Sequence, residues 1–213
     1  MVNFFVWAFD VFLHLDKYLA SIISQYGVIT YFLLFLVVFM ETGFVVTPFL
    51  PGDSLLFAAG ALSATSSLSV WVVYFLLLAA AVGGDTVNYW IGHYLGPVAF
   101  EKYPKVFKRK YLDKTHAFYA KYGNKTIVLA RFVPIVRTFA PFVAGVAKMT
   151  YPHFIMYNIV GGFLWVSFFV WGGFFFGNLP FVQKNFHYVV LGIILLSITP
   201  IIFEVVSSGK SRK

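Results

Sequence analysis

The chain has 213 residues, of which 60% are hydrophobic, 21% aromatic and 11% charged, and its formal net charge is +8. Soluble domains are about 45–50% apolar and about 25% charged, so this composition excludes a disordered chain and an ordinary soluble domain. The apolar runs approach the roughly 20 residues that cross a bilayer as a helix and do not alternate as barrel strands would, which predicts an all-α polytopic membrane protein.

The N-terminal part predicts an interfacial helix followed by a broken apolar segment. Residues 1–26 mix apolar and charged side chains, which predicts an amphipathic helix in the membrane interface or, as the alternative, the first half of a tilted span. Residues 28–66 are apolar, but three residues that cannot continue a helix interrupt them: Pro48, Pro51 and Gly52. Irregular backbone at membrane depth is tolerated only where protein or water covers it, so we expect a re-entrant hairpin here.

A complete span and a basic loop follow. Residues 70–96 are long enough to cross the bilayer, and within them Asp85 and Asn88 share one helix face. An accessory role at a binding site and an interhelical hydrogen bond both stay open for this pair.

Residues 100–125 form the predicted loop, in which eight Lys and Arg residues oppose the single Asp113 between positions 102 and 125, a net charge of +7. Basic loops between spans mark the cytoplasmic side, so we expect a cytoplasmic loop and not a nucleic-acid site.

A second broken segment lies beyond the basic loop. Residues 126–150 are apolar, yet they contain Arg131 and Arg137. They also contain two helix-breaking prolines, Pro134 and Pro141. This pattern predicts a second re-entrant hairpin, with both arginines inside it.

Two uninterrupted apolar segments complete the chain. Residues 154–177 and 187–206 are each long enough to span the bilayer, and the basic tail at 207–213 is expected to be cytoplasmic. Four tryptophans are expected to serve in part as interface anchors: Trp71, Trp90, Trp165 and Trp171.

A weak internal repeat relates the two halves of the chain. Phe57-Ala-Ala-Gly60 resembles Phe142-Val-Ala-Gly145, and Val82-Gly-Gly84 resembles Val160-Gly-Gly162. In each half a proline-broken hairpin precedes a glycine-rich span, and the positions of the basic segments make the two halves inverted. Inverted repeats with broken helices are typical of secondary transporters, whose binding site lies near the midplane of the bilayer.

Five ionisable residues lie at the predicted membrane depth: Glu41, Asp53, Asp85, Arg131 and Arg137. An unpaired charge there costs about 2.5–3.5 kcal/mol on insertion scales, so these residues must be paired or hydrated. The first hairpin supplies only acids and the second only bases. If the hairpins meet, their charges complement each other.

Two functional roles and one structural alternative fit these charges. Arg131 and Arg137 are predicted to bind the phosphate of a lipid, because guanidinium groups donate several hydrogen bonds to phosphate oxygens. Glu41 and Asp53 are predicted proton carriers, because burial favours the neutral form of a carboxyl group. In the alternative, the four residues form structural ion pairs that fix the hairpins.

These residues sit in motifs that resemble those of a known family. The runs ETGFVVTPFLPGDSLLFAAGAL and ARFVPIVRTFAP are similar to motifs of the DedA family, also called the SNARE-associated or VTT-domain family. The resemblance implies a multi-pass protein of the bacterial inner membrane that moves phospholipids or undecaprenyl phosphate, in some members with the proton-motive force. By motif position, the family's acidic pair falls on Glu41 and Asp53 and its arginine pair on Arg131 and Arg137.

Enzyme signatures are absent from the sequence. The histidines show no HExxH spacing for zinc and no G-x-S-x-G nucleophile elbow occurs, so we expect neither a metal nor a cofactor. The chain has no cysteine and therefore no disulfide. A lipid phosphatase would also need arginines around a phosphate, but Ser54 and Thr138 are the only nearby hydroxyls and no histidine accompanies them in sequence.

The sequence thus predicts a proton-linked lipid translocase whose partners are lipids with anionic or phosphate headgroups and protons. Two alternatives stay open: an antiporter that exchanges H⁺ or Na⁺ for a small ion, and a non-transporting protein that organises the membrane. An antiporter should move its ion whatever the lipid headgroup, which separates it from a lipid translocase. No prediction of the oligomeric state follows from the sequence.

Overall fold

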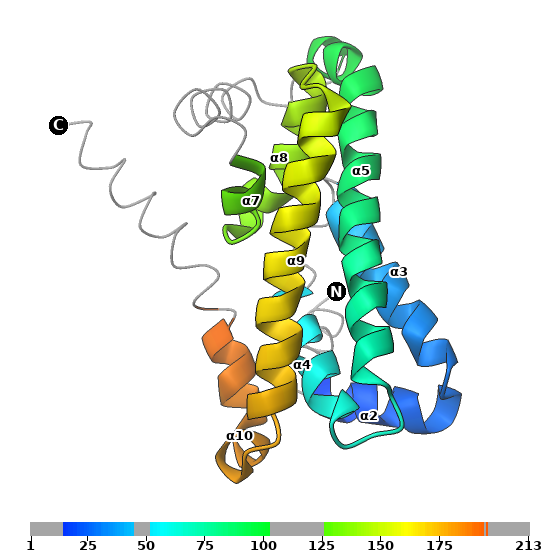
Figure 1. Cartoon of the computed structure of the whole chain (residues 1–213), viewed down its shortest axis with the longest axis vertical. Helices are drawn as coiled ribbons and strands as arrows, with labels where there is room; N and C mark the ends of the chain where they lie inside the picture. The colour runs from blue at the N-terminus through cyan, green and yellow to red at the C-terminus, as the bar shows by residue number, and fades with distance from the viewer. Residues whose placement is uncertain (1–14, 45–51, 103–125, 194, 196–213) are drawn as a thin grey trace, which may run out of the picture. The chain divides into compact units, whose positions relative to one another are not determined.

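The computed structural model describes residues 15–44, 52–102, 126–193 and 195, and every regular element in these ranges is an α-helix, as predicted (Figure 1). The helices in chain order are α2 (Leu15–Tyr26), α3 (Ile29–Gly43), α4 (Gly52–Ser63), α5 (Val70–Lys102), α7 (Thr126–Ala130), α8 (Pro134–Val146), α9 (Tyr151–Phe176) and α10 (Pro180–Lys184). Residues 186–193 are helical as well.

The helices divide between two compact units. Unit 1 comprises Met1–Val37, Pro51–Leu78 and Val166–Lys213, and unit 2 comprises Val38–Leu50 and Ala79–Trp165. Both long helices change unit along their length: α5 begins in unit 1 and ends in unit 2, whereas α9 begins in unit 2 and ends in unit 1. Each unit therefore holds a short helix beside a stretch of a long one, α4 with α9 in unit 1 and α8 with α5 in unit 2.

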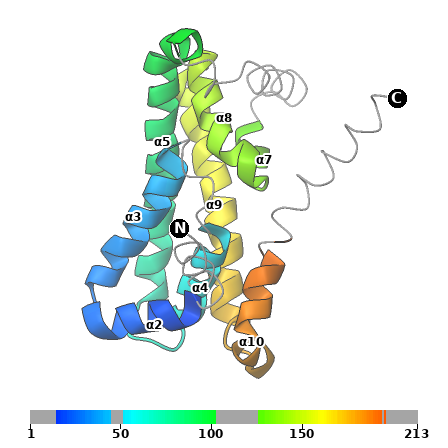
Figure 2. The ribbon, with the colours of Figure 1, turned by 180° about the vertical axis from the view of Figure 1, so that it is seen from behind.

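The described part of the predicted N-terminal amphipathic helix is α2, which has a buried face and an exposed face. In α2, Leu19 and Ile23 are one turn apart and buried, whereas Lys17 and Gln25 are exposed. The buried face belongs to a helix that contacts α4 within unit 1 (Figure 2). Residues 1–14 of the predicted helix lie outside the described residues.

In unit 1, α4 crosses α9 at two glycines. A Cβ added to Gly60 would lie 2.1 Å from the main-chain oxygen of Val170, and one added to Gly173 would lie 2.0 Å from that of Phe57. The two backbones are therefore in direct contact, which only residues without a side chain permit.

Unit 2 contains the same crossing between α8 and α5. A Cβ added to Gly145 would lie 2.0 Å from the oxygen of Tyr89, and one added to Gly92 would lie 2.0 Å from that of Phe142. The repeated motif ending in Gly60 and Gly145 thus corresponds to a repeated packing geometry.

The glycine contacts also correct one part of the predicted repeat. They make Gly92 of α5 the counterpart of Gly173 of α9, since each meets the phenylalanine of its repeated motif. The resemblance of Val82–Gly84 to Val160–Gly162 pairs residues that are 78 positions apart, whereas Gly92 and Gly173 are 81 positions apart, so it lies three positions out of register with the packing. Sequence similarity among small residues in apolar helices is thus a weak guide to register.

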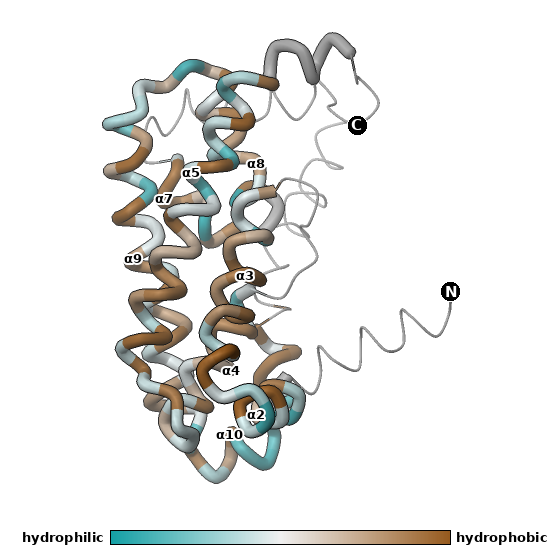
Figure 3. The backbone as a smooth tube through the Cα atoms, turned by 90° about the vertical axis from the view of Figure 1, so that its right-hand side faces the viewer, coloured by the Kyte–Doolittle hydropathy of each residue, from teal (hydrophilic) through white to brown (hydrophobic). Residues whose placement is uncertain are grey.

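Among the described residues, two helices are long and apolar enough to cross a membrane: Val70–Leu95 of α5 and Tyr151–Phe176 of α9. They match the predicted spans at 70–96 and 154–177, and they expose bulky apolar side chains such as Phe75. Figure 3 shows hydrophobic residues along most of the length of α9. Of the predicted span at 187–206, residues 196–206 lie outside the described residues, as do residues 103–125 of the basic loop and the basic tail.

Two of the predicted helix breaks, at Gly52 and Pro134, coincide with the first residue of a helix. Gly52 begins α4 and Pro134 begins α8, while Pro48 and Pro51 lie outside the described residues. The prediction that Pro141 breaks a helix is wrong, because α8 continues through it. A proline removes one intrahelical hydrogen bond and need not end a helix whose neighbouring residues are packed, and Ala140 and Phe142 on either side are buried.

Candidate functional site

The candidate site lies within unit 2, around the break between α7 and α8. Arg131 is the first residue after α7, and its N–H donates to the carbonyl oxygen of Val128 at 3.3 Å. Arg137 lies one turn into α8, with its N–H donating to Val133 at 2.8 Å. The arginine side chains are only 2% and 5% exposed, respectively. The break therefore places two guanidinium groups inside the protein.

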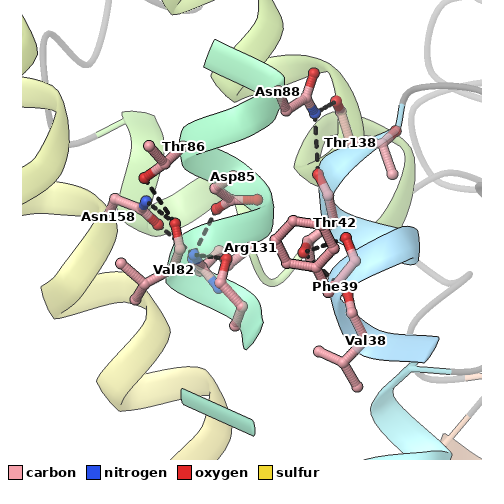
Figure 4. Close-up of polar contacts among 11 residues, drawn as sticks. Val38, Phe39, Thr42, Val82, Asp85, Thr86, Asn88, Arg131, Thr138 and Asn158 are labelled. Atoms are coloured by element: carbon pink, nitrogen blue, oxygen red, sulfur yellow. Dashed lines mark hydrogen bonds and ion pairs between the residues drawn. The ribbon is translucent and has the colours of Figure 1, made fainter. Parts of the chain in front are cut away.

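The Arg131 guanidinium is held by side chains from α5 and α9. Its Nη2 donates to the Asp85 carboxylate and to the Asn158 amide oxygen, and lies 3.5 Å from the carbonyl oxygen of Ala81 (Figure 4). The Asn158 amide nitrogen donates in turn to the carbonyl oxygen of Val82 at 3.0 Å. This arrangement fixes one end of the guanidinium group by a charge-assisted bond and an amide.

The rest of the Arg131 guanidinium is buried and leaves donors available. Its Nε and Nη1 have no hydrogen-bond partner among the described residues. Gly161 of α9 makes room for the side chain, since a Cβ there would lie 3.0 Å from Arg131 Cδ and 3.2 Å from its Nε. Buried donors of this kind are what an anionic ligand needs.

Arg137 forms the second ion pair of the site. Its Nη2 lies 2.6 Å from Oε1 of Glu41, which is completely buried near the end of α3. The guanidinium carbons of Arg137 and Arg131 lie 4.9 and 5.8 Å from the ring centroid of Trp165, respectively. One indole therefore contributes a cation–π contact to both arginines.

Asn88 connects the segments that carry Glu41 and Arg137. Its amide nitrogen donates to the main-chain oxygens of Thr42 at 3.1 Å and Thr138 at 2.8 Å (Figure 4). Each of these threonines directly follows a member of the ion pair. The amide oxygen of Asn88 is buried with no partner within the described part of the chain.

Close contact between α3 and α5 brings Glu41 into this site. A Cβ added to Gly84 would lie 2.0 Å from Thr42 Oγ1 and 2.8 Å from the carbonyl oxygen of Phe39. A Cβ added to Gly43 would lie 3.5 Å from Gly84, which is an ordinary contact. Gly84 is therefore the residue that lets the end of α3 approach α5 without an intervening side chain.

Five of the six predicted site residues meet in unit 2: Glu41, Asp85, Asn88, Arg131 and Arg137. Two arginines and two carboxylates make the cluster neutral, as expected for charges at membrane depth. Asp53 is the second residue of α4, belongs to unit 1 and is half-buried. The acid that pairs with Arg131 is thus Asp85, which the sequence suggested only as an accessory residue.

Three residues of α9 were not recognised from the sequence as part of the site: Asn158, Gly161 and Trp165. The expectation that Trp165 serves as an interface anchor is wrong, because its side chain is completely buried beneath the arginines. The three residues are spaced three and four positions apart, which puts them on one helix face. A lone asparagine on that face of an apolar helix was the available signal.

Comparison with known proteins gives consistent matches. The sequence model of the VTT domain matches residues 50–175. Protein DedA of Escherichia coli strain K12 is 54% identical over 200 residues, which cover 92% of this chain and 91% of that protein. Uncharacterized membrane protein Rv0364 of Mycobacterium tuberculosis strain H37Rv is 42% identical over 181 residues, 84% of this chain and 79% of that protein. Inner membrane protein YqjA of E. coli K12 is 30% identical over 179 residues, 84% and 81%, respectively. No solved structure shows a significant match.

Proposed function

Because the chain belongs to the DedA family of VTT-domain membrane proteins, we propose that it moves a lipid with a phosphate-bearing headgroup across the bacterial inner membrane. Undecaprenyl phosphate and phospholipids are the candidate substrates. The protein acts as a translocase, without a covalent step on the lipid.

The observation that carries this proposal is the state of Arg131. Its guanidinium group is buried and fixed at Nη2, while Nε and Nη1 have no partner among the described residues. A phosphate oxygen can accept hydrogen bonds from these donors, and the low dielectric surroundings strengthen such bonds. The guanidinium group is therefore already buried and oriented before an anion binds, so binding does not require its transfer from solvent.

Protons provide the coupling in this proposal. Glu41 holds Arg137 at 2.6 Å in the state described. Protonation of Glu41 removes the countercharge and makes Arg137 available to the phosphate, and deprotonation returns Arg137 to Glu41 and releases the lipid. Asp53, at the start of α4, the next helix along the chain, is the second proposed proton carrier.

The proposed function also includes a membrane arrangement. The helix pairs α3–α4 and α7–α8 are re-entrant, and residues 102–125 and 207–213 face the cytoplasm. Because the chain has no cysteine, single cysteines test this arrangement directly. A membrane-impermeant maleimide should label Thr65→Cys in intact cells, but Lys114→Cys and Ser211→Cys only after permeabilisation. Labelling of the last two in intact cells would contradict the orientation.

Lipid movement in proteoliposomes tests the function itself. Labelled undecaprenyl phosphate or phosphatidylethanolamine is followed with and without a pH gradient, for the wild type, Arg131→Ala and Lys184→Ala. We expect the wild type to move at least one lipid, Arg131→Ala to fall to the rate of empty liposomes, and Lys184→Ala to match the wild type. Lys184 is the matched control because it is an exposed cation on α10.

The same liposomes distinguish the alternatives. Transport of H⁺ or Na⁺ whatever the headgroup, without lipid movement, would identify an antiporter. Uptake of inorganic phosphate would assign the arginines to a free anion. Well-folded protein that moves neither lipid nor ion would favour a membrane-organising role, and the arginines would then be structural partners of the carboxylates.

A further inference from the structure

Both arginines of the candidate site are held from one face of α5. The carbonyl of Ala81, the carboxylate of Asp85 and the amide of Asn88 are four and three positions apart, so they point to the same side of the helix. On the basis of the proposed function, we propose that this face positions both arginines for the phosphate, through Asp85 and Asn88.

Asp85 acts on Arg131 directly. The carboxylate and the Asn158 amide oxygen bind the same guanidinium nitrogen, Nη2, from two helices. Bonds from two directions fix the plane of the guanidinium group, and they leave Nε and Nη1 in a defined place. A carboxylate that only balanced the charge of Arg131 could bind any nitrogen of the guanidinium group and would not have to bind Nη2.

Asn88 acts on Arg137 through the backbone. Its two hydrogen bonds end on Thr42 and Thr138, the residues that directly follow Glu41 and Arg137. The amide therefore sets the separation of the two main chains that carry the ion pair. Since Asn88 is fully buried, a leucine of similar volume would fill the same space without fixing this separation.

Asp85 and Asn88 are thus positioning residues, and Asp85→Glu and Asn88→Leu test them separately. The first keeps the charge but lengthens the side chain by one methylene, and the second keeps the volume but removes both hydrogen bonds. Thr86→Val is the matched control, because the Thr86 hydroxyl donates within α5, to the carbonyl oxygen of Val82 at 2.8 Å. Initial rates of undecaprenyl phosphate movement are compared in proteoliposomes.

A spectroscopic measurement reports arginine position independently of transport. The full chain is labelled with 5-fluorotryptophan, and the ¹⁹F resonance of Trp165 is assigned by its loss in Trp165→Phe. Since both guanidinium groups lie over the Trp165 ring, their displacement must change this resonance. We expect Asp85→Glu and Asn88→Leu to shift it and to lower the rate about tenfold or more, because misplacement by about 1 Å can cost two orders of magnitude. Thr86→Val should change neither quantity.

Folded variants with wild-type rate and an unshifted Trp165 resonance would overturn the proposal. If either variant fails to accumulate, Asp85→Asn and Asn88→Ser replace them, since each retains part of the hydrogen bonding. Failure of these milder variants to fold would assign the two residues to the fold alone and would also overturn the proposal. If the wild type moves no labelled lipid, the proposed function fails, but the resonance still decides whether α5 positions the arginines.

Discussion

Glu41 and Arg137 form a buried ion pair although 96 positions separate them in the chain. Removing one partner of such a pair leaves an uncompensated charge and costs about 3–5 kcal/mol. The pair therefore contributes to the fold of unit 2 as well as to the candidate site. Exchange of the two charges separates these contributions.

We expect Glu41→Arg and Arg137→Glu to lower the amount of folded protein when made singly. The double exchange should restore folded protein, because the ion pair is rebuilt, but not lipid movement, because the phosphate loses an arginine at its proper place. The yield of monodisperse protein and the proteoliposome rate measure the two effects.

The control for this exchange is Glu41→Arg combined with Arg131→Glu. In the structure Arg131 pairs with Asp85 and not with Glu41, so this second double variant should not recover folded protein. Equal recovery in both double variants would show that the charges interact without specific pairing.

The close approach of α3 to α5 predicts a large difference between two adjacent glycines. Gly84→Ala would place a Cβ 2.0 Å from Thr42 Oγ1, whereas Gly83→Ala would meet only the Phe39 ring, at 3.5 Å. We expect Gly84→Ala to destabilise the protein by about 1–3 kcal/mol, as overpacking does, and Gly83→Ala to be neutral. Thermal unfolding followed by size-exclusion chromatography in detergent measures both. Equal melting temperatures would mean that α3 does not contact α5 at Gly84.

The glycine crossing in each unit makes a similar prediction. A Cβ on Gly173 would overlap the backbone of α4, while the adjacent Gly172 has nothing within 4 Å. Gly173→Ala should lower the melting temperature, and Gly172→Ala should leave it unchanged or raise it, because alanine favours the helix by about 1 kcal/mol. Gly92→Ala should match Gly173→Ala, since the same crossing occurs in unit 2. An unchanged melting temperature for Gly92→Ala would mean that the two crossings are not equivalent.

The fold was predictable where composition and helix breakers determine it. Apolar length identified α5 and α9, and the rarity of proline inside helices located the start of α8 at Pro134. The same rarity of proline inside helices led to the wrong prediction at Pro141. Local helix propensity does not include the packing that keeps α8 helical around this residue. Register between helices was also beyond the sequence, since Gly84 and Gly92 look alike until their neighbours are known.

The site was predictable in its members and not in its pairing. A buried charge needs a partner, so Glu41, Arg131 and Arg137 were recognisable from their apolar surroundings. Three acids and two arginines allow several neutral combinations, and only helix contacts select among them. Asp85 pairs with Arg131 because α5 and α9 both reach the break after α7, which no local pattern encodes.

Trp165 gives the last prediction, because its ring lies under both guanidinium groups. Cation–π contacts with Phe are weaker than with Trp and are absent with Leu, and each is worth about 0.5–2 kcal/mol. We expect lipid movement to decrease in the order wild type, Trp165→Phe, Trp165→Leu, because the arginines lose a surface that holds them in place. Trp171→Phe is the control, since Trp171 packs against Trp71 and Tyr74 in unit 1. If Trp165→Leu folds and moves lipid at the wild-type rate, the ring only fills space, and the contacts of the arginines with Asp85, Asn158 and Glu41 are sufficient to hold them.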